Sequence, residues 1–224
     1  MTAYKYDTHV HTAETSPCGR VPAAEMVRLY SEAGYSGVVV TDHFTANVLN
    51  RQLFKGWGKK IDAYLKGYNA AVEAGKNYGL DIIFGIELTF DENKNDYLVF
   101  GIDEQFLRKN RDLHKLGLEK FRKLTAGGDI LIFQAHPFRP FMIPAPPSLI
   151  DGVEVYNGNP RHDSRNDLAC EYARKNGLMI SSGSDFHQPA DMARGGIILP
   201  ERIRSQKELV QAFREGLATE LIQT

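Results

Sequence analysis

Short apolar runs alternate with segments of helical periodicity along most of the chain. The runs are rich in Val, Ile and Leu, as expected of strands whose two faces are both buried. They predict strands at 3–6 (continuing into 9–11), 37–41, 80–88, 96–101, 130–133, 152–156, 179–183 and 195–199. Apolar residues three and four apart predict helices at 22–33, 61–78, 111–126, 164–176 and 205–217.

Turn and cap residues set the boundaries of these elements. Pro22 suits the first turn of a helix, and Gly34 ends that helix. The spacing of Ser205 and Glu208 predicts a capping box, and Ser164 with Asp167 resembles one. The segments 44–60 and 137–147 read as loops.

Strands that alternate with helices predict a parallel sheet covered on both faces. With about seven strands in one chain segment, we expect an α/β barrel rather than an open sheet. We expect one domain over residues 1–224, because 42% hydrophobic residues can bury a full core. In such barrels the active site lies at the C-terminal ends of the strands.

Composition excludes several classes of protein. A formal net charge of −1 gives no basic field for a nucleic-acid polymer. No apolar run is long enough to cross a bilayer, and the N-terminus lacks a signal-peptide pattern. Two cysteines cannot form a disulfide framework, so we expect a reduced, cytoplasmic enzyme.

Metal-capable side chains stand at the ends of separate predicted strands. They are His9 and His11, Asp42 and His43, Glu87, His136, and Asp185 and His187. Side chains alternate along a strand, so the two histidines of His9-Val10-His11 leave it on one side. We therefore predict a polynuclear metal site. Its mixed imidazole and carboxylate ligands suit Zn, Mn or Fe better than Ca or Mg.

Five motifs in order carry a family resemblance: His9-Val10-His11-Thr12, Thr41-Asp42-His43, Gly85-Ile86-Glu87, Ala135-His136-Pro137 and Gly183-Ser184-Asp185-Phe186-His187. Together they resemble the PHP (polymerase and histidinol phosphatase) family. The resemblance implies a distorted (β/α)7 TIM-like barrel with two to three divalent metals and phosphoester hydrolysis. It implies a first metal on His9, His11, Glu87 and Asp185, a second on Glu87 and His136, and a third on His43 and His187.

Two positions depart from the usual family pattern. Members often have Asp or His in the loop after the first motif, where this chain offers Cys18. A Cys18 thiolate would complete the third site, and an inert loop cysteine fits the sequence equally well. Many members also have a further His before the fourth motif, where only Asp96 could substitute.

Three arginines near strand ends could bind a phosphate group: Arg139, Arg161 and Arg194. A guanidinium group matches phosphate bidentately, although each could instead be a solvated or structural arginine. Glu154 and Asn157 are candidates for lining the same mouth.

We therefore expect a phosphoesterase that hydrolyses a small soluble ester, resembling histidinol phosphate or a nucleotide, through a metal-bridging hydroxide. Asp185, Glu87 and His187 are the expected catalytic residues, and Asp185 could both ligate and relay a proton. Hydrolysis of an amide, lactone or phosphotriester is one alternative, and a non-catalytic metal-stabilised domain is another. The expected partner is the small-molecule substrate, with no membrane and no nucleic-acid polymer; the sequence leaves the oligomeric state open.

Overall fold

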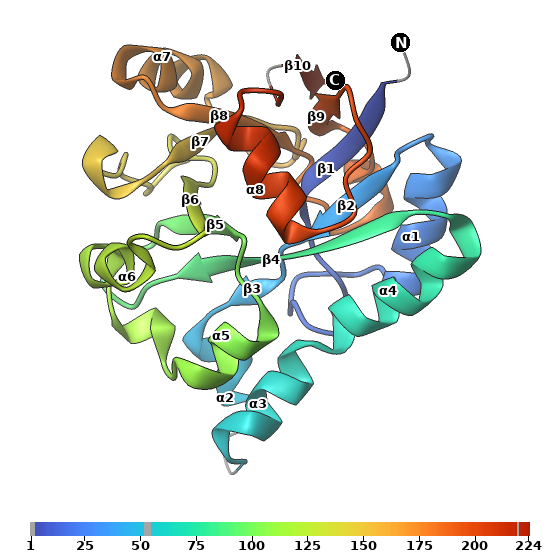
Figure 1. Ribbon diagram of the computed structural model, residues 1–224, viewed down its shortest axis with the longest axis horizontal. Helices are drawn as coiled ribbons and strands as arrows, with labels where there is room; N and C mark the ends of the chain where they lie inside the picture. The colour runs from blue at the N-terminus through green and yellow to red at the C-terminus, as the bar shows by residue number, and fades with distance from the viewer. Residues whose placement is uncertain (1–2, 52–54, 219) are drawn as a thin grey trace.

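Ten strands of the described chain form one mixed sheet, with helices around it (Figure 1). The computed structural model describes residues 3–51, 55–218 and 220–224. The strands pair in the order β10-β9-β1-β2-β4-β5-β6-β7-β8, and β3 pairs with β4. They are β1 (Tyr4–Val10), β2 (Gly37–Val40), β3 (His43–Phe44), β4 (Asp81–Thr89), β5 (Asp96–Phe100), β6 (Leu131–Gln134), β7 (Gly152–Asn157), β8 (Met179–Gly183), β9 (Gly195–Leu199) and β10 (Glu220–Gln223).

The sheet curls into a nearly closed barrel. A parallel bridge between Val10 and Phe186 links the end of β1 to the chain just beyond β8. The predicted α/β barrel is confirmed, but the strands are not all parallel. β5 runs antiparallel to β4 and β6, because the short turn at 90–95 can join only antiparallel neighbours. β9 and β10 add an antiparallel pair beside β1.

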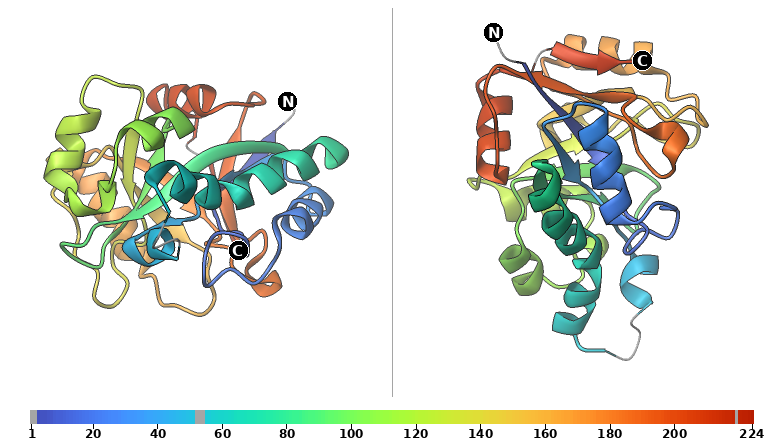
Figure 2. Two further views of the ribbon diagram at one scale, coloured as in Figure 1. Left: turned by 90° about the horizontal axis from the view of Figure 1, so that it is seen from below. Right: turned by 90° about the vertical axis from the view of Figure 1, so that its right-hand side faces the viewer.

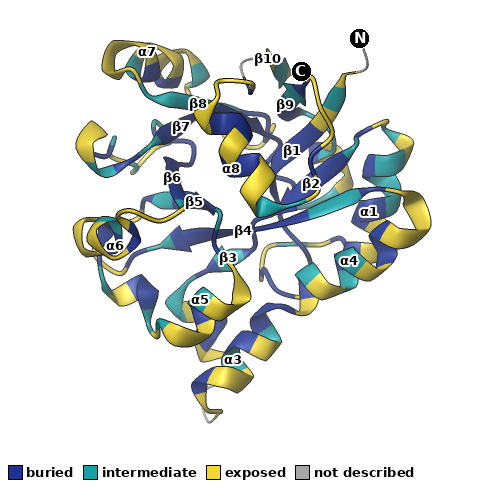
Figure 3. Ribbon diagram, viewed as in Figure 1, coloured by how far each residue is buried: buried dark blue, intermediate teal, exposed yellow. Residues whose placement is uncertain are grey.

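Helices cover the outside of the sheet. α1 (Ala23–Glu32) and α4 (Lys66–Tyr78) pack side by side, as both views in Figure 2 show. α7 (Asn166–Asn176) packs on β7, and α8 (Gln206–Arg214) packs on β4 and β5. Phe213 of α8 contacts Phe133 with ring centroids 4.8 Å apart. Buried residues lie along the strands and on the helix faces that pack against them (Figure 3). This packing holds in place the strand ends that carry the site.

The prediction of a loop at 44–60 is wrong for the described part of this segment; residues 52–54 lie outside the described residues. The segment contains α2 (Ala46–Asn50) and the start of α3 (Trp57–Tyr64). Thr45 caps α2 by accepting a hydrogen bond from Val48 N at 3.3 Å. The indole of Trp57 is buried and donates to Leu107 O, so α3 is held by tertiary contacts.

The predicted helix at 111–126 is also divided. It becomes a 3₁₀ turn, η1 (Leu113–Lys115), and α6 (Leu118–Thr125), with α5 (Glu104–Lys109) before them. Gly117 separates the two with a φ of +75°, a left-handed conformation that ends a regular helix. Two further 3₁₀ turns are η2 (Pro147–Leu149) and η3 (Pro189–Asp191).

One predicted cap is confirmed and one is wrong. Ser205 Oγ accepts from Glu208 N at 3.3 Å at the start of α8. Ser164 does not cap α7, whose N-cap is Arg165 without a side-chain hydrogen bond. The Ser164 hydroxyl instead accepts from Arg139 Nε at 3.1 Å. Among the described residues, no helix is long and apolar enough to span a bilayer.

Candidate metal centre

The metal-capable residues at the strand ends converge on one pocket of about 320 Å³. His9 lies on β1 and His11 directly after it, whereas Glu87 lies near the C-terminal end of β4. His136 and Asp185 follow β6 and β8. The residues that line the pocket are Cys18, Arg20, His43, Glu87, Asp96, His136, Arg139, Asn159, Arg161, His162, Asp185, His187 and Gln188.

The two histidines of the first motif are held through one ring nitrogen each. His9 Nδ1 lies 2.8 Å from Glu154 Oε1, and a carboxylate can only accept, so this nitrogen carries the proton. His11 Nδ1 lies 3.2 Å from Ser16 Oγ, whose own proton is donated to Asp42 Oδ1 at 2.6 Å. When the two rings are neutral, both Nε2 atoms therefore present lone pairs to the interior of the site.

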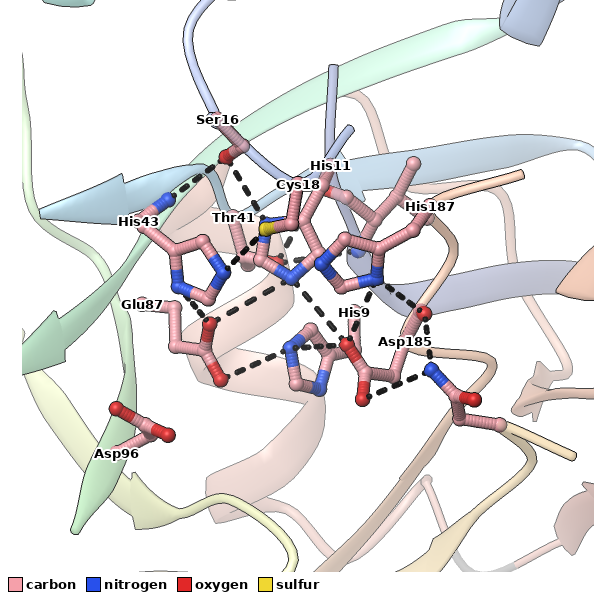
Figure 4. A network of polar contacts seen from close by, with 12 residues as sticks. His9, His11, Ser16, Cys18, Thr41, His43, Glu87, Asp96, Asp185 and His187 are labelled. Atoms are coloured by element: carbon pink, nitrogen blue, oxygen red, sulfur yellow. Dashed lines mark hydrogen bonds and ion pairs between the residues drawn. The ribbon is translucent and has the colours of Figure 1, made fainter. Parts of the chain in front are cut away.

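Glu87 contacts several of these imidazoles (Figure 4). Its Oε2 is 2.6 Å from His43 Nδ1, and its Oε1 is 3.1 Å from His9 Nε2. Its Oε1 is also 3.3 Å from His136 Nε2. Burial alone would raise the pKa of Glu87, but the positive charges of His43 and His9 hold it well below the usual range. The carboxylate is therefore ionised in the closed interior.

Asp185 closes the opposite side of the same space. Its Oδ1 lies 3.4 Å from His11 Nε2 and 3.3 Å from His187 Nδ1. Its Oδ2 accepts from Arg139 at 2.7 Å. Asp185 has a φ of +51° and His136 a φ of +31°, conformations that cost energy for residues other than glycine. The backbone is thus strained at two residues that point into the pocket.

Several buried polar atoms of this group lack a hydrogen-bond partner within the described residues. They are Nε2 of His9, Nε2 of His11, Nδ1 of His136 and both carboxylate oxygens of Glu87, whose close contacts with the surrounding imidazoles lack hydrogen-bond geometry. Leaving such atoms unpaired is costly unless something else binds them. Four overlapping triads have ligand atoms within 4.8 Å of one another: His9-His11-Glu87, His9-His136-Asp185, Glu87-Asp96-His136 and His11-His43-His187. The donor set and its unpaired atoms fit divalent metal ions.

Cys18 lies beside His43 and His187, at one side of the site. Its Sγ is 3.1 Å from His43 Nε2. Although burial would raise the pKa of the thiol, contacts with His187 and His43 lower it to about 6. The His11 ring lies 4.4 Å from that of His43 and 4.2 Å from that of His187, between centroids. Asp96 lies on the other side, with Oδ2 4.0 Å from His136 Nε2.

Comparisons with known proteins agree with this geometry. A family model described as PHP-associated matches residues 163–217, which include Asp185 and His187. A two-domain protein from Bacteroides vulgatus, described as containing a predicted PHP-like metal-dependent phosphoesterase, has a similar structure. It is 20% identical, with a TM-score of 0.60 over 97% of this chain and 63% of that one. The chain is thus similar to PHP proteins in the sequence of its C-terminal part and in its fold.

Two other solved structures share the fold of this chain. PsfC from Pseudomonas syringae is 18% identical, with a TM-score of 0.65 over 100% of this chain and 93% of that one. An amidohydrolase from Chromobacterium violaceum, solved with bound sulfate and no metal, is 16% identical. Its TM-score is 0.52 over 92% of this chain and 96% of that one. No curated protein matches the sequence.

The three arginines singled out in the sequence occupy different environments in the barrel. Arg139 lines the pocket and donates to Asp185, Asn157 and Ser164. Arg161 also lines the pocket and forms an ion pair with the buried carboxylate of Asp191.

Arg194 is not among the described residues that line this pocket. Its backbone packs against Gly158, and its carbonyl accepts from Thr224 N at 3.4 Å.

The sequence analysis gave no specific role to the residues that position the histidines of the candidate metal centre. Glu154 is fully buried and also accepts from His136 N and Asn157 Nδ2, both at 2.9 Å. The only sequence signal was a lone charge inside the apolar strand 152–156. Ser16, in the loop after the first motif, had no signal at all.

Proposed function

We propose that this chain is a metal-dependent phosphoesterase acting on a small soluble phosphate ester. The observation that carries the proposal is the set of buried, unpaired donor atoms around Glu87. The match of residues 163–217 to the PHP-associated family model and the description of the Bacteroides relative support hydrolysis of a phosphoester bond.

The proposed ligands divide into three overlapping groups. His9, His11, Glu87 and Asp185 would hold one ion; Glu87 and His136, with Asp96, a second; and His43 and His187, with Cys18, a third. Two to three Zn, Mn or Fe ions suit this mixture of nitrogen, oxygen and sulfur ligands. When bound, such ions would supply Lewis acidity and make an acidified water available near neutral pH.

The chain's own groups would orient the substrate and move protons. The Arg139 guanidinium fixes Asp185 Oδ2, and the pKa of Asp185 stays well below its usual range. Burial would raise that pKa, but His9 and Arg139 outweigh it. Asp185 is therefore ionised, and Oδ1 is the oxygen that would ligate a metal or relay a proton. Arg161, whose guanidinium Asp191 holds at the rim, could bind phosphate oxygens.

The test is phosphate release by protein loaded with Mn, Zn or Fe. Hydrolysis of p-nitrophenyl phosphate and of histidinol phosphate would be measured beside a metal-free control. The proposal expects turnover of at least one phosphate ester that depends on metal. No release from any monoester or diester with any of these metals would reject it.

A second candidate is hydrolysis of an amide, lactone or phosphotriester bond at the same metals. The likeness to an amidohydrolase fold is the observation that favours it. Inorganic phosphate separates the two candidates, because a phosphomonoesterase is inhibited by its product and an amidohydrolase need not be. A non-catalytic role would instead show as a loss of fold stability, without any associated activity, when metal is chelated.

A further inference from the structure

The pocket has two chemically different parts. The proposed metal ligands form its floor. Its other lining residues, here called the rim, are Arg20, Arg139, Asn159, Arg161, His162 and Gln188. Among the described residues that line it, none has a Phe, Tyr or Trp ring or an aliphatic side chain. Pockets for small organic molecules are usually lined mainly by such groups. The ligand is therefore hydrophilic over nearly all of its surface.

This lining disfavours a nucleotide. Proteins commonly hold nucleobases by stacking them on aromatic side chains, and the pocket offers only the imidazole of His162 outside the floor. The volume of about 320 Å³ is also at the lower end of the range for small-molecule sites. A base placed here would lose its hydration and gain little packing in return.

The three arginines at the rim differ in whether a carboxylate pairs with them. Arg139 is paired with Asp185, and Arg161 with Asp191. Arg20 has no acidic partner among the residues that the structure describes. Its backbone N–H donates to His187 O at 2.8 Å, which fixes Arg20 beside the floor of the pocket. One guanidinium at the rim is thus left for a ligand.

We propose that the substrate carries a second anionic group, which Arg20 binds at the rim while the phosphate ester lies on the floor. The inference rests on the proposed phosphoesterase function and narrows its substrate class. The substrate would be a small hydroxylated phosphate ester, and the second group a carboxylate or a second phosphate. Either would accept charge-assisted hydrogen bonds from the guanidinium.

Matched pairs of substrates test the proposal with metal-loaded protein. 3-Phosphoglycerate differs from glycerol 3-phosphate by a carboxylate in place of a hydroxymethyl group. The bisphosphate of 1,3-propanediol differs from its monophosphate by the second phosphate. In at least one pair, kcat/KM should be about tenfold higher for the doubly anionic member, as a charge-assisted hydrogen bond would give, and should exceed that for AMP. The pair that shows the preference identifies the second group.

Arg20→Met should bring that ratio close to one, mainly through KM. Arg111→Met, at an exposed arginine outside the pocket, is the matched control and should keep the ratio. Three results would each overturn the inference. They are kcat/KM ratios near one in both pairs for the wild type, AMP as the preferred substrate, and a ratio that Arg20→Met leaves unchanged. p-Nitrophenyl phosphate separates this failure from a failure of the proposed function: turnover of it without any pair preference rejects only the second anion. No turnover of any phosphate rejects both.

Discussion

His9 and His11 illustrate how the site is prepared at the scale of single residues. Each ring is held at Nδ1, by Glu154 and Ser16 respectively, and each leaves Nε2 free. A hydrogen bond from the second nitrogen to a carboxylate fixes the orientation of a ligating imidazole and raises its basicity. Glu154 therefore acts on the proposed metal site through His9, as a positioning residue.

Glu154→Gln should lower the affinity for the most tightly bound metal by about 10- to 100-fold, the usual cost of losing such a partner. The glutamine keeps an acceptor for His9 but loses the charge, and its amide cannot also accept from His136 N. Metal affinity would be measured by competition with a chelator, and the His9 tautomer by ¹⁵N NMR of the ring. Glu171→Gln, at an exposed position on α7, is the control. Unchanged affinity and an unchanged tautomer would refute this role.

Individual site residues differed in how far the sequence could predict them. His9, His43, Glu87, His136 and Asp185 could be selected because each stands at the end of an apolar run. Their convergence then followed from the barrel. The contact of Glu154 with His9 joins residues 145 positions apart, and local spacing carries no signal for it. Ser16 depends on how one irregular loop folds against Asp42.

At the scale of elements, α6 and the turn before it depend on Gly117. Its φ of +75° is unfavourable for other residues, and a Cβ there would lie 2.2 Å from Glu92 Oε2. That carboxylate accepts from Leu118 N at 2.9 Å and so serves the first turn of α6. A side chain at position 117 would strain the backbone and displace this partner.

Gly117→Ala should lower the free energy of unfolding by about 1 kcal/mol more than Gly127→Ala does. Gly127 has a similar φ of +78°, but no atom would lie within 4 Å of an added Cβ. The difference between the two variants therefore isolates the loss of the Glu92 contact. Urea denaturation of both variants beside wild type gives the values. Equal losses would show that Glu92 contributes nothing to α6.

Helical periodicity predicted the long elements and missed the interruptions. The apolar positions of 111–126 fit one helix, but a single left-handed glycine divides it. In 44–60, local sequence offered few helix signals, and α3 depends on the burial of Trp57 against Leu107. The cap at Ser205 was predictable because it uses only neighbouring residues, whereas Ser164 has a distant partner in Arg139.

At the scale of the whole molecule, the alternation of strands and helices predicted the barrel. It could not predict that β5 is antiparallel, because strand direction depends on the connection and not on the composition of the strand. The added β9 and β10 pair with β1 from the far end of the chain. The antiparallel strands do not change the predicted position of the site, because the C-terminal ends of the parallel strands that carry it still lie together.

Metal binding should couple the site to the stability of the whole fold. Burial would lower the pKa of His9, but the carboxylates of Glu154, Asp185 and Glu87 raise it well above 6.5. In metal-free protein the protonated His9 therefore stabilises the fold below its unfolded pKa, about 6.5, and this stability is lost as pH rises through the folded pKa. Metal must displace that proton, so its apparent affinity rises with pH.

The difference in Tm between metal-loaded and chelated protein should accordingly widen from pH 6 to pH 8. With free metal at 100 times Kd, the gain is about 2.7 kcal/mol, or roughly 5–10 °C for a chain of this size. Thermal unfolding followed by circular dichroism at each pH measures it. A difference that stays constant or narrows with rising pH would contradict the coupling.

The most direct test of the proposed metal centre is metal per chain, determined by elemental analysis together with phosphate release. Wild type, Glu87→Gln and Cys18→Ser would be compared. Wild type should contain two to three ions. Glu87→Gln should lose at least one ion and nearly all activity, because one amide oxygen cannot bridge two cations. Cys18→Ser should lose at most one ion. A Glu87→Gln protein with full metal content and a normal rate would contradict the metal centre described above.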